Sequence, residues 1–380
     1  MKPPTMLRSA HKSRTLPPVL SSPSARVVVI GAGLSGLAVA ARLVSSGRDV
    51  LVLEGSARAG GQIHTRREGG LVVELGAEGF VARGLAVPAL AQLLGIQGSL
   101  VEQLSTDTYA VEGSELTLLP PGEAARRLGF QVPPEELGRG IRSFAQGMGE
   151  LVDALLARVG SQRLRLGVEV SALRRTPGGL LVQLADGQRE AADVVVMAAP
   201  ARLAAGLLEP LGVAESAPLA MAPLMSNVSV NLLYSSAQFR NYPAGSGLIF
   251  PQSFADVGLR ALSLVEHKFA GRVPAGQALL RVFFRPVGDA LTAWTDERFA
   301  TEAAQAIGRV LPVQGAPART WVSRWANALP VFSQEHRARA AALDVALQPL
   351  GVHVVGSAFH GAGIDAAVGS AEIVAARLMS

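Results

Sequence analysis

The spacing of apolar residues near the start of the chain predicts a strand, a helix and a second strand in immediate succession. Residues 26–30 form an apolar run that is typical of a buried strand, and residues 34–46 repeat apolar positions at helical spacing. Residues 49–54 predict the second strand. These elements make a compact βαβ unit, which is half of a nucleotide-binding fold.

Further along the chain, strand patterns and helical patterns are interleaved. Turns such as TPGG and ADG divide one group of strands, and alternation between residues 227 and 284 indicates an antiparallel sheet. Further strands are predicted at 71–75, 164–173, 180–184, 193–198, 227–233, 247–250, 262–267, 279–284 and 352–355, and further helices at 80–95, 147–159, 297–310 and 365–378.

This order of elements predicts two interleaved domains, for which 380 residues, 49% of them hydrophobic, can supply the cores. The nucleotide-binding domain is assigned to 26–85, 150–215 and 345–380, and the substrate domain to 86–149 and 216–344. Residues 1–25 are basic and rich in Ser and Pro and have no apolar signal core, which predicts a disordered leader.

Composition narrows the classes of function. The chain has 35 basic and 30 acidic residues, a net charge of +5, and its arginines are dispersed, which disfavours nucleic-acid binding. It has no cysteine, so disulfides, zinc–thiolate sites and a thiol nucleophile are excluded. No metal is expected. The uncharged run at 27–41 is shorter than the roughly 20 residues of a membrane-spanning helix. We expect a cytoplasmic protein and leave peripheral contact with the inner membrane face open.

The sequence GAGLSG at 31–36 carries glycines at the spacing G-x-G-x-x-G, directly after the first predicted strand. Gly31 permits a tight turn, Gly33 lets the backbone approach a pyrophosphate, and Gly36 lets the helix pack closely against the strand. The start of the helix then offers free N–H groups to the phosphates. This context predicts a dinucleotide site.

Glu54 ends the second strand, 23 positions after Gly31, where a ribose hydroxyl needs an acceptor. Its charge disfavours the 2′-phosphate of NADP, which leaves NAD and FAD. A second glycine pair follows in RAGGQ, at Gly60 and Gly61. On spacing alone this pair is explained equally well by an ordinary turn or by a channel that continues past the adenosine.

Three further stretches make the chain recognisable: GGLVVELGAEGF at 69–80, RWANALPVFSQEH at 324–336 and VVGSAFHGAGIDAAVGSAEIVAARL at 354–378. Together with the glycine motif, the acid and the R-x-G-G turn, they resemble the flavin-containing amine oxidase superfamily. Within it, the pattern of Trp325, Pro330 and His336 is similar to the oxygen-dependent protoporphyrinogen oxidases. The resemblance covers nearly the whole chain after the leader.

The resemblance implies an α/β fold in which a Rossmann-like FAD-binding domain of the amine-oxidase type is interleaved with an α+β substrate domain that contains a mixed or antiparallel sheet. It also implies which residues contact FAD. They are Gly31, Ala32, Gly33, Leu34, Ser35, Gly36, Glu54, Gly55, Gly60, Gly61, Gln62, Gly76, Ala77, Glu78, Gly79, Val170, Trp325, Gly356, Gly363, Ile364 and Asp365.

The implied reaction is the oxidation of protoporphyrinogen IX to protoporphyrin IX, with molecular oxygen as the acceptor, in haem and porphyrin biosynthesis. The flavin carries the chemistry, so no catalytic side chain is assigned, and His336 and His360 are interpreted as structural. Because the substrate carries propionates, its pocket should offer a cation. Arg83 is the first candidate and Arg281 the second.

The sequence departs from the resembled family between residues 98 and 147, where family members carry a longer helical insert and this chain has a short connection rich in Pro and Gly. The shorter insert affects which substrate and which membrane contact are expected, whereas it leaves the expected FAD binding unchanged. Coproporphyrinogen, an amine or a polyene therefore remain alternative substrates, as does a non-catalytic FAD-binding protein. Glu78 would also place a negative charge where a substrate carboxylate could approach.

Overall fold

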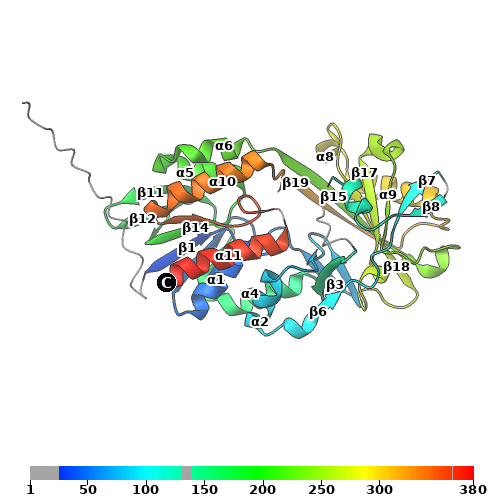
Figure 1. Cartoon of the computed structure of the whole chain (residues 1–380), viewed down its shortest axis with the longest axis horizontal. Helices are drawn as coiled ribbons and strands as arrows, with labels where there is room; N and C mark the ends of the chain where they lie inside the picture. Colours follow the sequence, from blue (N-terminus) through cyan, green and yellow to red (C-terminus); the bar gives the residue numbers. More distant parts are fainter. Residues whose placement is uncertain (1–24, 114, 130–137, 362) are drawn as a thin grey trace, which may run out of the picture.

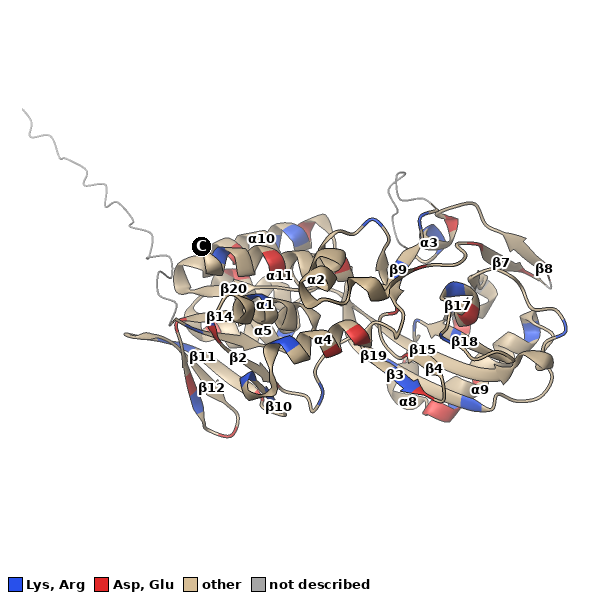
Figure 2. Ribbon diagram, turned by 90° about the horizontal axis from the view of Figure 1, so that it is seen from below, with Lys and Arg blue, Asp and Glu red and all other residues tan. Residues whose placement is uncertain are grey.

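The computed structural model describes residues 25–113, 115–129, 138–361 and 363–380, and shows two units joined by long strands (Figure 1). Residues 1–24 of the predicted leader lie outside the described residues. Basic and acidic residues are interspersed over both units (Figure 2), as the dispersed arginines of the sequence suggest.

The first unit is built on a five-stranded sheet whose strands are all parallel. Its order is β10 (Leu164–Leu166), β2 (Asp49–Glu54), β1 (Arg26–Ile30), β14 (Val194–Met197) and β20 (Val352–Val354). Residues 27–30 and 194–197 are completely buried apolar runs, because both faces of the sheet are covered.

Helices cover one face of this sheet: α1 (Leu34–Ser45), α2 (Ala86–Leu94), α4 (Gly149–Val159) and α11 (Ile364–Met379). The other face packs against the antiparallel sheet β11 (Val170–Thr176), β12 (Gly179–Leu184) and β13 (Arg189–Ala192) and the helices α5 (Ala201–Leu208) and α10 (Gln334–Leu347). The short helix α6 (Ala217–Ala220) lies beside α5 and α10 (Figure 1). The result is a three-layer unit.

Several boundaries differ from those expected from the sequence. The predicted strand 164–173 is divided at Gly167, where a φ of 68° turns the chain from the parallel sheet into β11. The predicted helix 80–95 begins only at Ala86, because Phe80 and Val81 form the short strand β5. Helices α2 and α10, assigned to the substrate domain, pack on the nucleotide-binding unit, since their apolar faces complete its two cores.

The second unit is a seven-stranded mixed sheet in which only β16 and β7 pair in parallel. Its order is β19 (Arg319–Pro330), β15 (Leu224–Ser235), β18 (Gln277–Phe284), β17 (Leu259–Leu264), β16 (Gly247–Ile249), β7 (Thr108–Glu112) and β8 (Glu115–Leu118). Helix α9 (Asp296–Val310) packs its apolar face on this sheet, and Thr295 caps it by accepting a hydrogen bond from the Arg298 amide. The short helix α7 (Val265–Lys268) connects β17 to β18.

The segment 98–147 contains more structure than the connection expected from the sequence. Strands β7 and β8 add to the edge of the seven-stranded sheet, while β6 (Leu100–Glu102) and β9 (Ile141–Phe144) form a small sheet with β5 (Phe80–Val81). A short helix, α3 (Glu123–Arg127), follows β8, and residues 130–137 lie outside the described residues. A hairpin of β3 (Thr65–Glu68) and β4 (Leu71–Glu74) completes the connection between the units.

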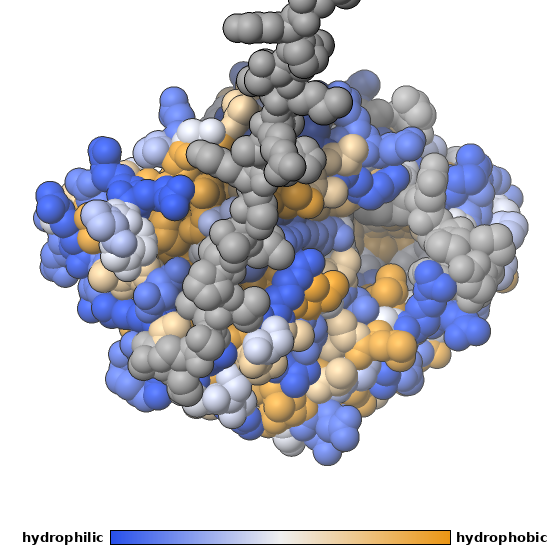
Figure 3. All heavy atoms as spheres, turned by 60° about the vertical axis from the view of Figure 1, so that its left-hand side comes forward, coloured by the Kyte–Doolittle hydropathy of each residue, from blue (hydrophilic) through white to orange (hydrophobic). Residues whose placement is uncertain are grey.

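Hydrophobic and hydrophilic residues are mixed over the face shown in Figure 3. Within the described part of the chain, every helix is too short or too polar to cross a bilayer.

Candidate functional site

A cavity of about 700 Å³ lies at the carboxyl ends of the parallel strands, next to Ile30, Leu53 and Val355. This edge is where nucleotides bind in open α/β sheets. The volume falls within the roughly 300–1,000 Å³ that ligand pockets occupy. Segments from the beginning, middle and end of the chain line it.

The glycine motif forms one wall of this cavity, and each of its glycines has a distinct reason for lacking a side chain. Gly31 has a φ of 106°, and a Cβ there would lie 2.7 Å from the Ala198 carbonyl oxygen. A Cβ at Gly36 would lie 2.0 Å from the Gly31 carbonyl oxygen. At Gly33, by contrast, a Cβ would have no described protein atom within 4 Å, and this residue lines the cavity. Gly33 therefore keeps space for a ligand, whereas Gly31 and Gly36 permit packing.

The second glycine pair packs directly against the first motif. The Gly60 amide donates to the Ala32 carbonyl oxygen at 2.7 Å, and Gly33 and Gly60 form a parallel β-bridge. A Cβ at Gly61 would lie 3.1 Å from the Gly33 Cα. Arg58 holds the turn by donating to the Ala59 and Ile63 carbonyl oxygens, each at 2.8 Å. The pair is thus part of the cavity wall, which argues against an isolated turn.

Glu54 lies at the end of β2 and lines the same cavity. Its Oε2 accepts a hydrogen bond from the Ala32 amide at 2.7 Å, and its Oε1 accepts from the Ser56 amide at 2.9 Å and from the Ser56 hydroxyl at 2.7 Å. A carboxylate has about four acceptor positions, so Glu54 retains capacity for a ribose hydroxyl.

The same cavity is lined by Gly356, which lies beside Ser35, and by Gly363 and Ile364 at the start of α11. Gly363 caps this helix without a side-chain hydrogen bond, which leaves the positive end of the helix dipole facing the cavity. The Asp365 carboxylate turns away and accepts from the Val87 amide of α2 at 3.0 Å. Two helix N-termini and an open glycine therefore face one cavity, an arrangement that fits FAD.

A smaller chamber of about 200 Å³ adjoins the cavity and shares Gln62, Ala77, Trp325 and Leu329 with it. The remaining residues of its wall are Gly76, Glu78, Asn227, Arg281 and Phe283. Hydrogen bonds fix two of the shared residues: Gln62 Nε2 donates to the Ala328 carbonyl oxygen at 2.6 Å, and Trp325 Nε1 donates to the Leu75 carbonyl oxygen at 2.8 Å. The chamber is therefore a side pocket of the predicted flavin site.

Glu78 in the chamber wall is held between two cations. Lys268 Nζ forms an ion pair with Oε1, and Arg281 Nη1 lies 3.0 Å from Oε2. Burial alone would raise the pKa of Glu78, but the charges of Lys268 and Arg281 outweigh burial and lower this pKa to about 2. Glu78 is therefore a carboxylate at neutral pH, and two positive charges surround it.

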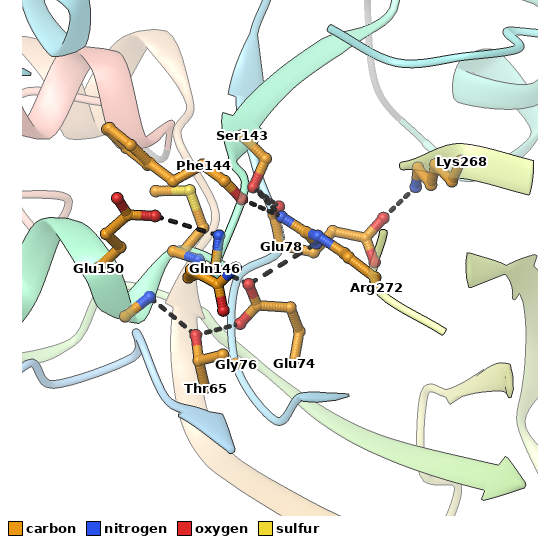
Figure 4. A network of polar contacts seen from close by, with 12 residues as sticks. Thr65, Glu74, Gly76, Glu78, Ser143, Phe144, Gln146, Glu150, Lys268 and Arg272 are labelled. Atoms are coloured by element: carbon orange, nitrogen blue, oxygen red, sulfur yellow. Dashed lines mark hydrogen bonds and ion pairs between the residues drawn. The ribbon is translucent and has the colours of Figure 1, made fainter. Parts of the chain in front are cut away.

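A second buried carboxylate, Glu74, belongs to a network of polar contacts near Glu78 (Figure 4). Glu74 Oε1 accepts from the Met148 amide at 2.6 Å and lies 3.8 Å from Arg272 Nη1, while Oε2 accepts from the Thr65 hydroxyl at 2.7 Å. Burial raises the pKa of Glu74 despite the nearby Arg272. Arg272 also donates to the Phe144 carbonyl oxygen at 2.8 Å, so this network fastens the loop before β18 to β4 and β9.

Most residues expected from the sequence to contact FAD are brought together by the structure. Those lining the cavity are Gly31, Gly33, Leu34, Ser35, Glu54, Gly55, Gly60, Gly61, Gln62, Ala77, Val170, Trp325, Gly356, Gly363 and Ile364. Gly76 and Glu78 line only the chamber, whereas Ala32, Gly36, Gly79 and Asp365 line neither space and act through the backbone or through packing. These contacts with FAD stay predictions.

The two arginines considered for the substrate differ in position. Arg83 is exposed and lines neither space, whereas Arg281 lines the chamber and is 3% exposed. His336 and His360 are hydrogen-bonded through Nε2 to the carbonyl oxygens of Ala358 and Val354, as expected of structural residues.

No sequence pattern indicates Lys268, Arg272 or the partners of Glu74, because their roles depend on contacts between distant segments. Asn327 was also missed. It lines the cavity with a left-handed φ of 48°, and its amide donates to the Ser226 hydroxyl at 2.9 Å.

Comparisons with known proteins agree with this geometry. The model of the flavin-containing amine oxidoreductase family matches residues 114–379, and that of an NAD(P)-binding Rossmann-like domain matches residues 29–93. The chain is 33% identical to the coproporphyrinogen III oxidase of Propionibacterium freudenreichii over 61% of this chain and 43% of that protein. It is 20% identical to the coproporphyrinogen III oxidase of Bacillus subtilis over 91% of this chain and 96% of that protein.

A solved structure from Exiguobacterium sp. 255-15, provisionally described as a protoporphyrinogen oxidase, has the same fold, with a TM-score of 0.79 and 20% identity over 94% of this chain and 99% of that one. The family match confirms the predicted α/β fold with a Rossmann-like unit, the FAD cofactor and the oxidoreductase class. The chain belongs to the flavin-containing amine oxidoreductase family.

Proposed function

We propose that this protein is an FAD-dependent porphyrinogen oxidase. The observation that carries the proposal is the chamber beside the flavin site, whose charged wall contains Arg281 and Glu78 and has Lys268 directly behind it. One carboxylate between two cations leaves this wall with a net positive charge. A substrate carboxylate such as a porphyrinogen propionate complements that charge.

The bound flavin supplies the hydride acceptor for oxidation of a porphyrinogen carbon. The residues of the chain bind and orient the substrate beside it. Trp325 and Phe283 supply flat apolar surface in the chamber, and Arg281 supplies a cation in its wall. We assign molecular oxygen as the final acceptor, which consumption of oxygen during turnover would test.

Coproporphyrinogen III is the first candidate substrate and protoporphyrinogen IX the second. The relatives named coproporphyrinogen III oxidases support the first choice. In addition, coproporphyrinogen carries a propionate on every pyrrole ring, whereas protoporphyrinogen carries vinyl groups in place of some of them. A net positive wall favours the substrate with more carboxylates.

An amine fits this chamber less well, because a cationic substrate would meet Arg281 and Lys268. A polyene offers no group for the buried charges. A non-catalytic FAD-binding protein would keep the cavity but would not oxidise a porphyrinogen.

The proposal is tested by incubating the FAD-loaded protein with each porphyrinogen under air and following porphyrin fluorescence. We expect a rise faster than autoxidation, with a higher kcat/KM for coproporphyrinogen, and simultaneous uptake of oxygen. The flavin-free protein is the control for autoxidation. Full flavin occupancy with traces at the autoxidation rate for both substrates would overturn the proposal.

A further inference from the structure

Glu78 occupies an unusual position for a carboxylate near a site that is proposed to bind carboxylates. It lines the chamber, yet both of its oxygens are engaged by cations, Lys268 on Oε1 and Arg281 on Oε2. Glu78 and Arg281 are the ionisable residues among the described lining of the chamber. The charge that a ligand meets there is consequently set by this triad.

The triad is rigidly held. Arg281 is 3% exposed, its Nη2 donates to the Gly76 carbonyl oxygen, and its guanidinium lies 4.8 Å from the centre of the Phe283 ring. The Ser143 hydroxyl donates to the Glu78 carbonyl oxygen at 2.7 Å, which fixes the turn that carries Glu78. Because these groups are fixed before a ligand arrives, binding need not order them.

Arg281 retains donor capacity. Its Nε is buried without a hydrogen-bond partner among the described residues, although the cost of such an unmet donor is about 1–3 kcal/mol. Among the described residues, Lys268 and Arg281 form ion pairs with the same carboxylate, Glu78, while the neighbouring Arg272 forms an ion pair with Glu74. The triad thus has one uncompensated positive charge beside a space of about 200 Å³.

We propose that Glu78 is a specificity-determining residue, which together with Lys268 and Arg281 sets the net charge of the chamber and thereby how strongly the chamber binds a carboxylate. Glu78 lowers the net charge of the triad from +2 to +1, which weakens the attraction for a carboxylate but leaves it favourable. This inference rests on the proposed function only for the identity of the substrate whose carboxylate is bound. The effect of charge on binding is expected for any aromatic acid that enters the chamber.

The alternative is that the triad merely fastens the turn at 76–79 to the sheet. The two explanations differ in what they predict for variants that change the charge. A fastening role predicts that each loss of an ion pair weakens the structure, whichever member is removed. A charge-setting role predicts that affinity follows the sum of the charges.

The test uses four forms of the FAD-loaded protein: wild type, Glu78→Gln, Lys268→Met and the double variant that carries both changes. Their triads have net charges of +2 for Glu78→Gln, zero for Lys268→Met and +1 for the other two. Benzoate is the probe, because a space of about 150 Å³ can hold a benzene ring. Its dissociation constant is measured from the change in the flavin absorbance spectrum and by calorimetry.

We expect the dissociation constant to fall about tenfold in Glu78→Gln, to rise about tenfold in Lys268→Met, and to return near the wild-type value in the double variant. Flavin content and thermal unfolding establish that each form is folded. If Glu78→Gln does not fold, the comparison of Lys268→Met with the double variant carries the test. Glu68→Gln, which changes the same charge on β3 outside both spaces, should leave benzoate binding unchanged.

Equal affinity in all the folded forms, a double variant that resembles Lys268→Met, or no benzoate binding would overturn the inference. This test does not depend on porphyrinogen turnover. If porphyrinogen is oxidised but benzoate affinity does not change with the charge of the triad, only the role of Glu78 is rejected. Benzoate affinity that follows the charges in a protein without porphyrinogen turnover would reject only the proposed function.

Discussion

Replacing Gly33 and Gly36 by alanine, one at a time, should separate binding of the cofactor from packing of the fold. At Gly36 a new Cβ would lie 2.0 Å from the Gly31 carbonyl oxygen and 3.0 Å from the Ala198 Cβ. At Gly33 it would have no described protein atom within 4 Å and would project toward the cavity. The same added methyl group therefore tests packing at Gly36 and space for the cofactor at Gly33.

The Gly36 methyl group must displace backbone, because its nearest neighbour is a carbonyl oxygen rather than a flexible side chain. Overpacking of this kind costs about 3 kcal/mol, which exceeds the roughly 1 kcal/mol that alanine gains over glycine inside a helix. Gly36→Ala should lower the free energy of unfolding of the flavin-free protein by about 2 kcal/mol. Gly33→Ala should change it by less than about 1 kcal/mol, since Gly33 is an N-cap residue at an ordinary φ of −69°.

For FAD affinity the order of the two variants should be reversed, with the larger effect in Gly33→Ala. Gly33→Ala places its methyl group in the space predicted for the pyrophosphate, so we expect affinity for FAD to fall about a hundredfold, equivalent to ~2.7 kcal/mol. Urea unfolding of the flavin-free proteins and flavin fluorescence titrations measure the two effects. Gly206→Ala is the control, because this exposed position in α5 has no described atom within 4 Å of a new Cβ. Tight FAD binding by Gly33→Ala would refute the assignment of this loop, and an unchanged stability of Gly36→Ala would refute the packing argument.

Three further predictions concern the buried polar contacts. Arg272→Met removes the cation beside Glu74 and should lower the free energy of unfolding in urea by about 3 kcal/mol, and a value near zero would show that the pair contributes little. Because burial raises the pKa of Glu74, wild type should lose stability relative to Glu74→Gln as pH rises above 4.5, with a constant difference at lower pH; the opposite slope in thermal unfolding would contradict this. Asp365→Ala removes the acceptor for the Val87 amide and should cost about 1 kcal/mol in the same measurement, with partial recovery in Asp365→Asn.

The nucleotide-binding half of the site can be predicted from the sequence because its determinants are local. Gly31, Gly33 and Gly36 act within one turn, and Glu54 follows the next strand at a spacing fixed by the βαβ geometry. Local backbone constraints of this kind produce a residue spacing that can be recognised in the sequence without knowledge of the rest of the fold. The same holds for the start of α11, where Gly363 precedes a regular helical repeat.

The substrate half cannot be predicted in this way, because its determinants are assembled from distant strands. Arg83 follows the GAEGF stretch closely in sequence, but the chain turns outward after β5 and leaves it exposed. Arg281 arrives from β18, 203 positions after its partner Glu78. Lys268 and Arg272 lie in EHKFAGR, a stretch with the composition of a surface loop. Tertiary packing leaves Lys268 only partly exposed and buries Arg272.

The segment that carries Trp325 shows why a motif can be specific without being catalytic. Strands β15 and β19 run from the seven-stranded sheet toward the first unit (Figure 1), and their pairing is irregular between Met225 and Asn227. Opposite this irregularity Asn327 takes a left-handed φ of 48°, a conformation that costs of order 1–3 kcal/mol and that the surroundings must hold in place. The bend directs Trp325 into both spaces and brings the Ala328 carbonyl oxygen to Gln62. Trp325 and Pro330 therefore lie on a strand that changes direction at the predicted flavin site, and Trp325 lines both the cavity and the chamber. His336 follows in α10 and lines neither space, so its place in the spacing reflects packing of the helix.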